Sequence, residues 1–148
     1  MEGFNSFAKL NGNIKVQVVR NNEIVETREI TNTVTSVGKS AVAGLILSDV
    51  AGTAFDYLAV GTGNTAPGTA STALVAELYR TGGTGTRNTS TATATLSGSF
   101  AITASATLRE MGILNSSSTG TLLARATFSD LAVNNADTVN AIYNIVVA

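Results

Sequence analysis

The sequence predicts a mainly β fold, an antiparallel β-sandwich (barrel-like) with one short α-helix near residues 36–47. The clearest observation is in residues 91–108, where every even position is apolar or glycine and nearly every odd position is Thr or Ser. About eight extended segments are separated by turn-forming residues and not by repeated helices, which favours antiparallel pairing. A single segment changes to a helical period.

The chain is expected to begin with an N-terminal arm, residues 1–12, in which Phe4, Phe7 and Leu10 are spaced by three. Residues 13–148 are expected to form a single β-sandwich domain. A chain of 148 residues is long enough to bury one hydrophobic core.

The first two strands are predicted as a hairpin. Residues 13–20 alternate between apolar and polar side chains, and residues 23–30 form the return strand with charges on its outer face. Asn21 and Asn22 lie between them, and asparagine tolerates the positive φ that a two-residue hairpin turn requires. The charged return strand is predicted to lie at a sheet edge.

Residues 35–47 carry the helical pattern. Val37, Ala41 and Leu45 recur every four residues, with two further apolar residues beside them, and so form one stripe. The glycines in this segment weaken an isolated helix but permit close packing on a sheet. This segment is predicted to be the only substantial helix of the chain.

The middle of the chain alternates between short strands and loops. Residues 55–60 are predicted as a strand and residues 61–68 as a loop. One or two helical turns are expected in residues 72–78, and a flexible turn at residues 82–85.

The alternating segment of residues 91–108 is too long for one strand, since it would span about 55 Å. We expect a break either near Gly98 or near residues 103–105. After it, residues 110–114, 122–128 and 138–147 are predicted as strands.

The turn cluster of residues 115–120 separates the first two of these late strands. A loop at residues 130–137 is expected before the last one.

Composition excludes several kinds of chemistry. The chain has no His and no Cys, which removes Ser-His-Asp and Cys-His catalysis, structural zinc, iron–sulfur clusters and disulfides. We therefore predict no catalytic residue, no metal site and no cofactor, and expect that the protein is not an enzyme.

Charge and hydropathy narrow the expected partners. A net charge of −1 argues against nucleic-acid binding, which requires a basic surface. No apolar run approaches the roughly 18 residues of a membrane span, so we expect no membrane partner. The N-terminus lacks the order of a signal peptide, and we expect synthesis in a cytoplasm.

Two glycine motifs resemble nucleotide sites without meeting their patterns. Gly38-Lys39-Ser40 has Thr33 where a phosphate-binding loop needs its first glycine. Gly61-Thr62-Gly63 has Ala66 at the third glycine position of a dinucleotide fingerprint. Both are interpreted as structural.

Carboxylates are the remaining candidates for chemistry, because a pair of them can hydrolyse glycosides. The chain has no Trp to stack on a sugar. We favour a structural ion pair of Glu110 with Arg80 or Arg125, since charges beside core strands are usually paired. The candidate acids are Asp56, Glu77, Glu110, Asp130 and Asp137.

Four stretches, in order along residues 32–128, carry a resemblance to a known family. They are Asn32-Thr33-Val34-Thr35-Ser36-Val37-Gly38-Lys39, the segment from Tyr57 to Pro67 with Thr72-Ala73-Leu74, Glu77 and Arg80, Leu108-Arg109-Glu110-Met111-Gly112-Ile113-Leu114, and Gly120-Thr121-Leu122-Leu123-Ala124-Arg125-Ala126-Thr127-Phe128. The chain resembles tailed-bacteriophage virion structural proteins of the small head-decoration or tail-collar fibre-type β domain family.

The resemblance implies a virion structural protein on the outer surface of a bacteriophage. It would be a capsid decoration or head-fibre subunit, or a tail or baseplate component, acting by self-association and by docking on shell or tube subunits. The expected partners are copies of itself, with a homotrimer preferred, and the major capsid protein or tail and baseplate proteins. The expected localisation is the virion, and a chain that stops at Ala148 is expected to be a stand-alone building block.

The alternative is an adhesion module of a tail fibre that binds host-surface glycan. Polar loops on a rigid β scaffold suit such a role, and we expect them at residues 61–72, 81–90 and 115–120. The residues expected to contact a partner are Thr62, Asn64, Thr65, Asn88 and Asn115.

Overall fold

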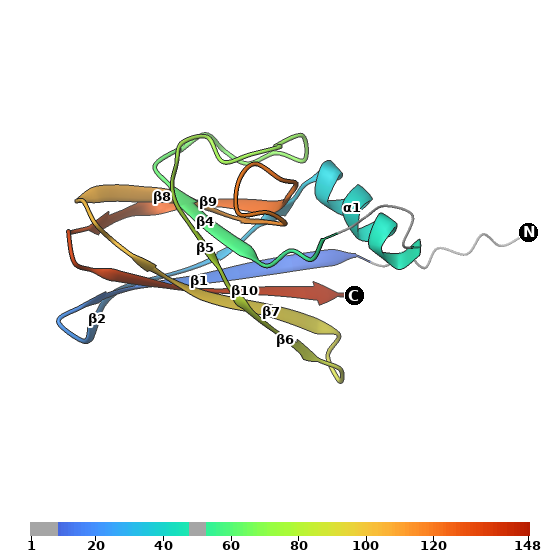
Figure 1. Ribbon diagram of the computed structural model, residues 1–148, viewed down its shortest axis with the longest axis horizontal. Helices are drawn as coiled ribbons and strands as arrows, with labels where there is room; N and C mark the ends of the chain where they lie inside the picture. The colour runs from blue at the N-terminus through green and yellow to red at the C-terminus, as the bar shows by residue number, and fades with distance from the viewer. Residues whose placement is uncertain (1–8, 48–52) are drawn as a thin grey trace, which may run out of the picture.

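Two antiparallel sheets of five strands each face one another in the computed structural model, which describes residues 9–47 and 53–148 (Figure 1). The strand order is β2-β1-β10-β7-β6 in one sheet and β3-β9-β8-β4-β5 in the other. This confirms the predicted β-sandwich, and the predicted helix is α1, Ser36–Leu47. The strands are β1 Leu10–Arg20, β2 Glu23–Thr31, β3 Thr33–Val34, β4 Tyr57–Gly61, β5 Glu77–Gly82, β6 Thr84–Asn88, β7 Thr93–Ala101, β8 Ala106–Leu114, β9 Leu122–Val133 and β10 Thr138–Val147.

The β1–β2 hairpin forms as predicted. Asn21 and Asn22 have φ angles of 52° and 63°, the left-handed values that a type I′ turn requires at both central positions. Strand β2 lies at the edge of its sheet, and most of its side chains are exposed. Charged side chains on this edge disfavour pairing with another sheet.

The long alternating segment breaks at the second of the two expected places. Strand β7 ends at Ala101 and β8 begins at Ala106, in the opposite sheet. Buried Ile102 lies in the crossing, where its N–H donates to the carbonyl of Asp137 at 2.9 Å. The crossing therefore joins the two sheets at the end far from α1 (Figure 1).

A β-bulge in β8 decides which residues face the core. The register with β9 shifts between Leu108 and Glu110, so Leu108 lies in the core between the sheets and Met111 and Ile113 continue it. The alternate residues of β8, Glu110 among them, consequently face the outside of the sheet. That outer face is covered as well, because every residue from Glu110 to Leu114 is buried.

Two predictions for the middle of the chain are wrong. Residues 72–76 contain no helical turn and lead directly into β5. Residues 82–85 do not form a flexible turn, because β5 and β6 continue across Gly83 from one sheet to the other. A Cβ on Gly83 would lie 2.7 Å from Cδ1 of Leu96, so the glycine permits a close crossing where we had predicted flexibility.

Two predicted boundaries also differ. The arm was expected to include residues 10–12, but these residues pair with β10 as the start of β1; residues 1–8, with Phe4 and Phe7, lie outside the described residues. The loop expected at residues 130–137 is only a turn of residues 134–137, since Leu131 and Val133 keep β9 alternating into the core.

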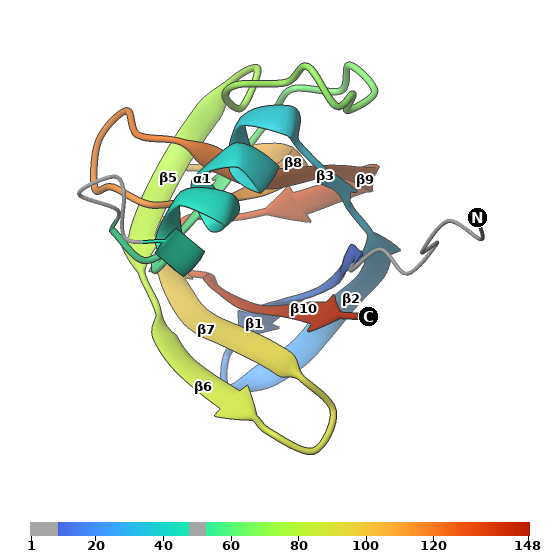
Figure 2. The same cartoon turned by 90° about the vertical axis from the view of Figure 1, so that its right-hand side faces the viewer.

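Helix α1 covers one end of the sandwich (Figure 2). It approaches β9 so closely that a Cβ on Gly38 would lie 2.6 Å from the Cα of Leu123. The packed face therefore follows Gly38 and Val42, and the predicted stripe is rotated away from it: Val37 and Leu45 are each 39% exposed. Among the described residues, no helix has the length and apolar character needed to cross a membrane.

Candidate docking surface

Most of the acidic side chains singled out from the sequence are held by arginines. Four of the five each bind a different arginine, and Asp56 lies at the rim of a pocket described below. Chemistry by a carboxylate pair needs one acid free to donate a proton and another free to react. Side chains bound to guanidinium groups instead stabilise the fold. The pairs are Glu77–Arg80, Glu110–Arg125, Asp130–Arg109 and Asp137–Arg20, with shortest N–O distances of 2.7 Å.

Two of these carboxyls show the electrostatic effect of their partners. The hydrogen bond from Arg109 lowers the pKa of Asp130, and the hydrogen bond from Arg20 lowers the pKa of Asp137. Both groups therefore stay ionised, and neither is held protonated as a general acid would be.

Glu110 is the most completely bound of the acids. It is 0% exposed, and its Oε2 accepts from Nε of Arg125 at 2.7 Å. Its carboxylate also accepts three backbone N–H groups of the loop between β4 and β5, residues 62–76: Gly63 at 3.1 Å, Val75 at 2.9 Å and Ala76 at 2.7 Å. We call Glu110, Arg125 and these three amides the Glu110 cluster.

The Glu110 cluster explains the glycine motif at its edge. A Cβ on Gly61 would lie 2.7 Å from Oε1 of Glu110, and a Cβ on Gly63 would lie 2.6 Å from the same atom. These glycines make room for a carboxylate of the protein itself. The motif is structural, and it fixes the 62–76 loop over β8.

Arg80 does not contact Glu110. It binds Glu77 through Nε and Nη2, and its Nη1 donates to the carbonyls of Ser116 and Thr119, each at 2.8 Å. Of the two partners proposed for Glu110, the structure therefore brings Arg125 to it, while Arg80 anchors the loop of residues 115–121.

The residues expected to contact a partner lie in three separate places. Figure 2 shows the 62–76 loop at the top, the 115–121 loop at the left and the β6–β7 turn at the bottom. The segment expected as a loop at residues 81–90 is mostly strand, because β6 occupies Thr84–Asn88. These segments do not form one continuous surface. The expected residues are Thr62, Asn64 and Thr65 in the first loop, Asn115 at the start of the second and Asn88 at the end of β6.

Two of these asparagines are used within their own turns. Oδ1 of Asn88 accepts from the backbone N–H of Ser90 at 3.0 Å, and Oδ1 of Asn115 accepts from that of Thr121 at 2.7 Å. Their side-chain carbonyls shape the chain and are not free acceptors for a ligand.

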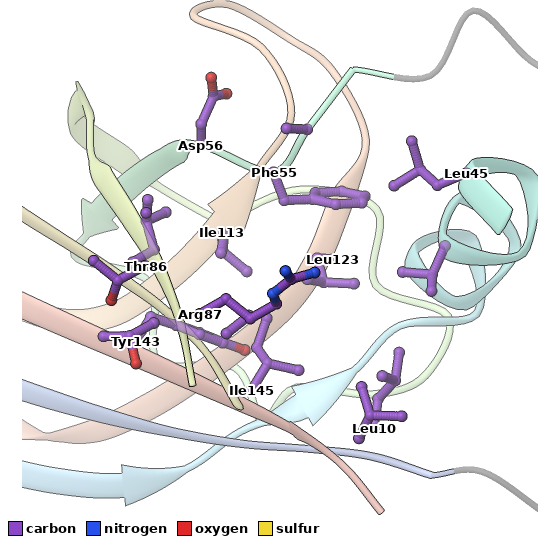
Figure 3. Close-up of a pocket in the computed structure, with 17 residues that line it drawn as sticks. Leu10, Leu45, Phe55, Asp56, Thr86, Arg87, Ile113, Leu123, Tyr143 and Ile145 are labelled. Atoms are coloured by element: carbon purple, nitrogen blue, oxygen red, sulfur yellow. The ribbon is translucent and has the colours of Figure 1, made fainter. Parts of the chain in front are cut away.

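An apolar pocket opens between the two sheets at the α1 end of the sandwich (Figure 3). Its volume is about 610 Å³. Both sheets, the segment before β4 and the helix contribute side chains to it. The apolar side chains that line it are Leu10, Val42, Leu45, Ala54, Phe55, Ala94, Leu96, Ile113, Leu123, Tyr143, Ile145 and Val147.

The titratable groups of the pocket are few. Among its lining residues they are Asp56, Arg87 and Tyr143. Figure 3 shows the guanidinium of Arg87 reaching inward past Ile145, while the Asp56 carboxylate points away from the centre. Tyr143 is 0% exposed, and burial raises the pKa of its hydroxyl. The pocket offers an apolar surface and one cation, without a nucleophile paired to a base.

The helix extends this apolar surface beyond the pocket. Ile46 is 78% exposed and lies beside Leu45, which lines the pocket. Sequence reasoning missed the pocket, although one signal for it was present: α1 has more apolar positions than one packed face can use. We call the pocket and the exposed apolar side of α1 the α1-end surface.

Among the described residues, no group of three Asp and Glu side chains is placed to hold a metal ion. Comparison of the chain with protein-family models, with curated proteins and with solved structures gave no match. The assignment of function therefore depends on the residues and their geometry.

Proposed function

We propose that the protein is a structural component on the outer surface of a bacteriophage particle, either a capsid decoration or head-fibre subunit or a tail or baseplate component. It acts by docking and self-association through the α1-end surface. The observation that carries the proposal is this apolar surface at one end of a sandwich whose described carboxylates are mostly bound to arginines. The sequence resemblance to virion proteins supports the same role.

The energetic argument concerns exposed apolar groups. Leu45, Ile46 and Val37 are exposed on one short helix, and Leu45 also lines the open apolar pocket. A contiguous apolar patch on the surface of a soluble monomer marks a site of protein association. Burial of one such side chain against a partner contributes about 1.5–3 kcal/mol, so a few of them support specific docking.

The proposed partners are further copies of this chain and the shell or tube subunits of the particle, namely the major capsid protein or tail and baseplate proteins. We propose a homotrimer as the assembled form. Native mass spectrometry of the purified protein tests this stoichiometry, and a dimer as the largest species would contradict it.

The role in the particle is tested on purified virions. Mass spectrometry of virions is expected to detect this chain at a fixed ratio to the major capsid protein, and cryo-electron microscopy of labelled virions is expected to place it on the outer surface. Virions that lack the chain would contradict the proposal. Density on the head would indicate a capsid decoration or head-fibre subunit, and density on the tail would indicate a tail or baseplate component.

A second proposal is a glycan-binding adhesion module, and a different feature supports it. A polar hollow of about 620 Å³ lies on the outer face of the β1-β10-β7 sheet, lined by Gln17, Ser97, Ser99 and Asn140 among others. Neutral hydroxyl and amide groups are suited to hydrogen bonds with sugars. A glycan array tests this proposal: binding that Gln17→Ala and Asn140→Ala abolish would support it, and an array without binding would exclude it.

A further inference from the structure

The chain itself contains a segment whose chemistry matches the pocket. Residues 1–8 have the sequence Met-Glu-Gly-Phe-Asn-Ser-Phe-Ala, with two phenyl rings and Glu2 as the one charged side chain. The pocket has apolar walls and Arg87 as the one cationic side chain among its lining residues. We propose that residues 1–8 of one copy insert into the pocket of a neighbouring copy, with Phe4 and Phe7 between the sheets and Glu2 beside Arg87.

The size of the pocket supports this occupant. A closed apolar cavity of about 150 Å³ holds one benzene molecule. The pocket measures about 610 Å³, which leaves room for two phenyl rings and the backbone between them. The rings would contact Leu123, Phe55 and Ile145, which surround the centre of the pocket in Figure 3.

The start of β1 places this segment at the rim of a pocket. Lys9 exchanges two backbone hydrogen bonds with Ala148, Lys9 N to Ala148 O at 2.6 Å and Ala148 N to Lys9 O at 2.8 Å. Leu10 and Val147, the next pair inward, both line the pocket. Residues 1–8 therefore join the described chain where two copies can meet through their α1 ends.

The same pairing favours a neighbouring copy over the chain's own pocket. Antiparallel pairing through Lys9 keeps the chain extended to that residue, beyond the end of β1. Entry of Phe7 into its own pocket requires a reversal within residues 7–9, which contain no Gly, Pro, Asn or Asp. An arm that continues outward reaches a second copy without a reversal.

Such an exchange specifies the geometry of assembly. Where one copy supplies an arm and the next copy supplies a pocket, the contact is heterologous, and such contacts build a ring when the rotation between neighbours closes. The inference thus rests on the self-association in the proposed function and is compatible with a homotrimer. It does not depend on where in the particle the protein lies.

Site-directed cross-linking tests the exchange directly, because the chain has no cysteine. Full-length chains with Phe7→Cys are mixed with size-tagged full-length chains that carry Leu45→Cys at the pocket, and a short bis-maleimide is added. We expect the mixed product to exceed by at least tenfold that formed with Thr27→Cys, which is exposed on β2. A yield equal to this control would overturn the inference.

A chain with both Phe7→Cys and Leu45→Cys distinguishes the alternative occupant. Inter-chain products that persist at low protein concentration support exchange. Cross-linking only within single chains would show that the arm fills its own pocket, and would overturn the inference while leaving the proposed function intact.

Sedimentation measurements test the two phenyl rings. The double variant Phe4→Ala/Phe7→Ala is expected to raise the dissociation constant of the assembly at least 100-fold with an unchanged β circular-dichroism spectrum. The matched variant Phe4→Leu/Phe7→Leu keeps apolar side chains, and its dissociation constant is expected to stay within tenfold of the wild-type value. Equal assembly of the Ala variant and wild type would overturn the arm exchange, whereas the presence of the chain in virions tests the proposed function separately.

The charged pair is tested by exchange of its charges. Glu2→Lys and Arg87→Glu are each expected to weaken assembly by two- to fivefold, as for exposed ion pairs. The double variant is expected to recover wild-type affinity. Additive losses in the double variant would contradict the contact between Glu2 and Arg87.

Discussion

The face of β8 beneath the 62–76 loop and the pocket at the α1 end are both deep in the molecule, yet they are completed in opposite ways. Beneath the loop, Glu110 is surrounded by three backbone amides and Arg125. At the α1 end, apolar side chains from both sheets surround open space. In the first region both carboxylate oxygens of Glu110 are bound within the fold, whereas the second region leaves apolar surface available.

This difference separates stability from interaction. A buried carboxylate is usually a first candidate for catalysis, but here its oxygens are used to hold the 62–76 loop. The region without charged networks is the one with capacity for a partner. In this protein the strongest polar contacts therefore identify the scaffold, and the apolar end carries the docking surface that we propose.

The largest expected effect comes from removal of the carboxylate. Glu110→Ala leaves three backbone amides and a buried guanidinium without their acceptor, and we expect it to lower the free energy of unfolding by about 3–5 kcal/mol. Urea denaturation measures the loss. Glu29→Ala, in an exposed pair with Lys15 at 3.6 Å, is the control and is expected to cost less than about 1 kcal/mol. Equal losses would contradict the structural role of the Glu110 cluster.

Arg125→Met removes the other partner of the Glu110–Arg125 ion pair. The carboxylate then keeps its three backbone donors, so we expect a smaller loss of stability than for Glu110→Ala. Limited proteolysis measures how firmly the 62–76 loop is held in each variant. The rate of cleavage in this loop should increase strongly in Glu110→Ala and less in Arg125→Met. The reverse order would show that the guanidinium, and not the carboxylate, holds the loop.

Whether a feature of this fold can be predicted from the sequence depends on how far apart in the chain the interacting residues are. The Asn21-Asn22 turn and the helix near residues 36–47 are local, and their residues predict them. The choice of Arg125 over Arg80 for Glu110 depends on the β8–β9 register and its bulge, which no local pattern encodes. Gly61 and Gly63 indicated a turn, but their closeness to Glu110 emerges only from the folded chain.

The pocket shows the same limit. Leu10, Phe55 and Ile145 come from distant parts of the chain, and each is an ordinary apolar residue in its own segment. The β-sandwich was predictable because alternation is a local property of each strand. The open end was not, because it depends on how far α1 and the two sheets stand apart.

The end of the sandwich opposite α1 is closed by polar contacts, and acid is expected to weaken them. Asp137 accepts from Arg20 at 2.9 and 2.7 Å and from the Asn134 amide at 2.8 Å. These contacts lower the pKa of Asp137 below the usual 3.8. Their contribution to the free energy of unfolding is therefore present above about pH 4 and is lost as the pH falls through the lowered pKa.

Asp137→Asn is therefore expected to cost about 1.5–3 kcal/mol at pH 7. Urea denaturation of both proteins between pH 7 and pH 2 measures the difference, which should narrow below about pH 4. Asp130→Asn serves as the control, because its carboxylate is exposed, and should change stability less. A difference that is constant with pH would exclude the charge of Asp137 as the cause.

Tyr143→Phe tests whether the hydroxyl of Tyr143, beside the pocket, contributes to stability. The hydroxyl is buried and has no hydrogen-bond partner within the described protein, so its removal discards no contact. We expect the free energy of unfolding to stay equal or to rise by up to about 1 kcal/mol. A loss above about 1 kcal/mol, measured by thermal or urea unfolding, would show that the pocket depends on a polar contact as the closed regions do.

The smallest expected effect concerns backbone strain in the 134–137 turn. Ala136 has a φ of 71°, a left-handed value that costs an alanine about 1 kcal/mol relative to glycine. Ala136→Gly relieves this strain but gives the unfolded chain more freedom, so we expect a net gain of about 0.5 kcal/mol. Ala132→Gly, in strand β9, is the matched control and should lose about 0.5–1 kcal/mol. If both variants lose stability equally, the positive φ of Ala136 does not strain the turn.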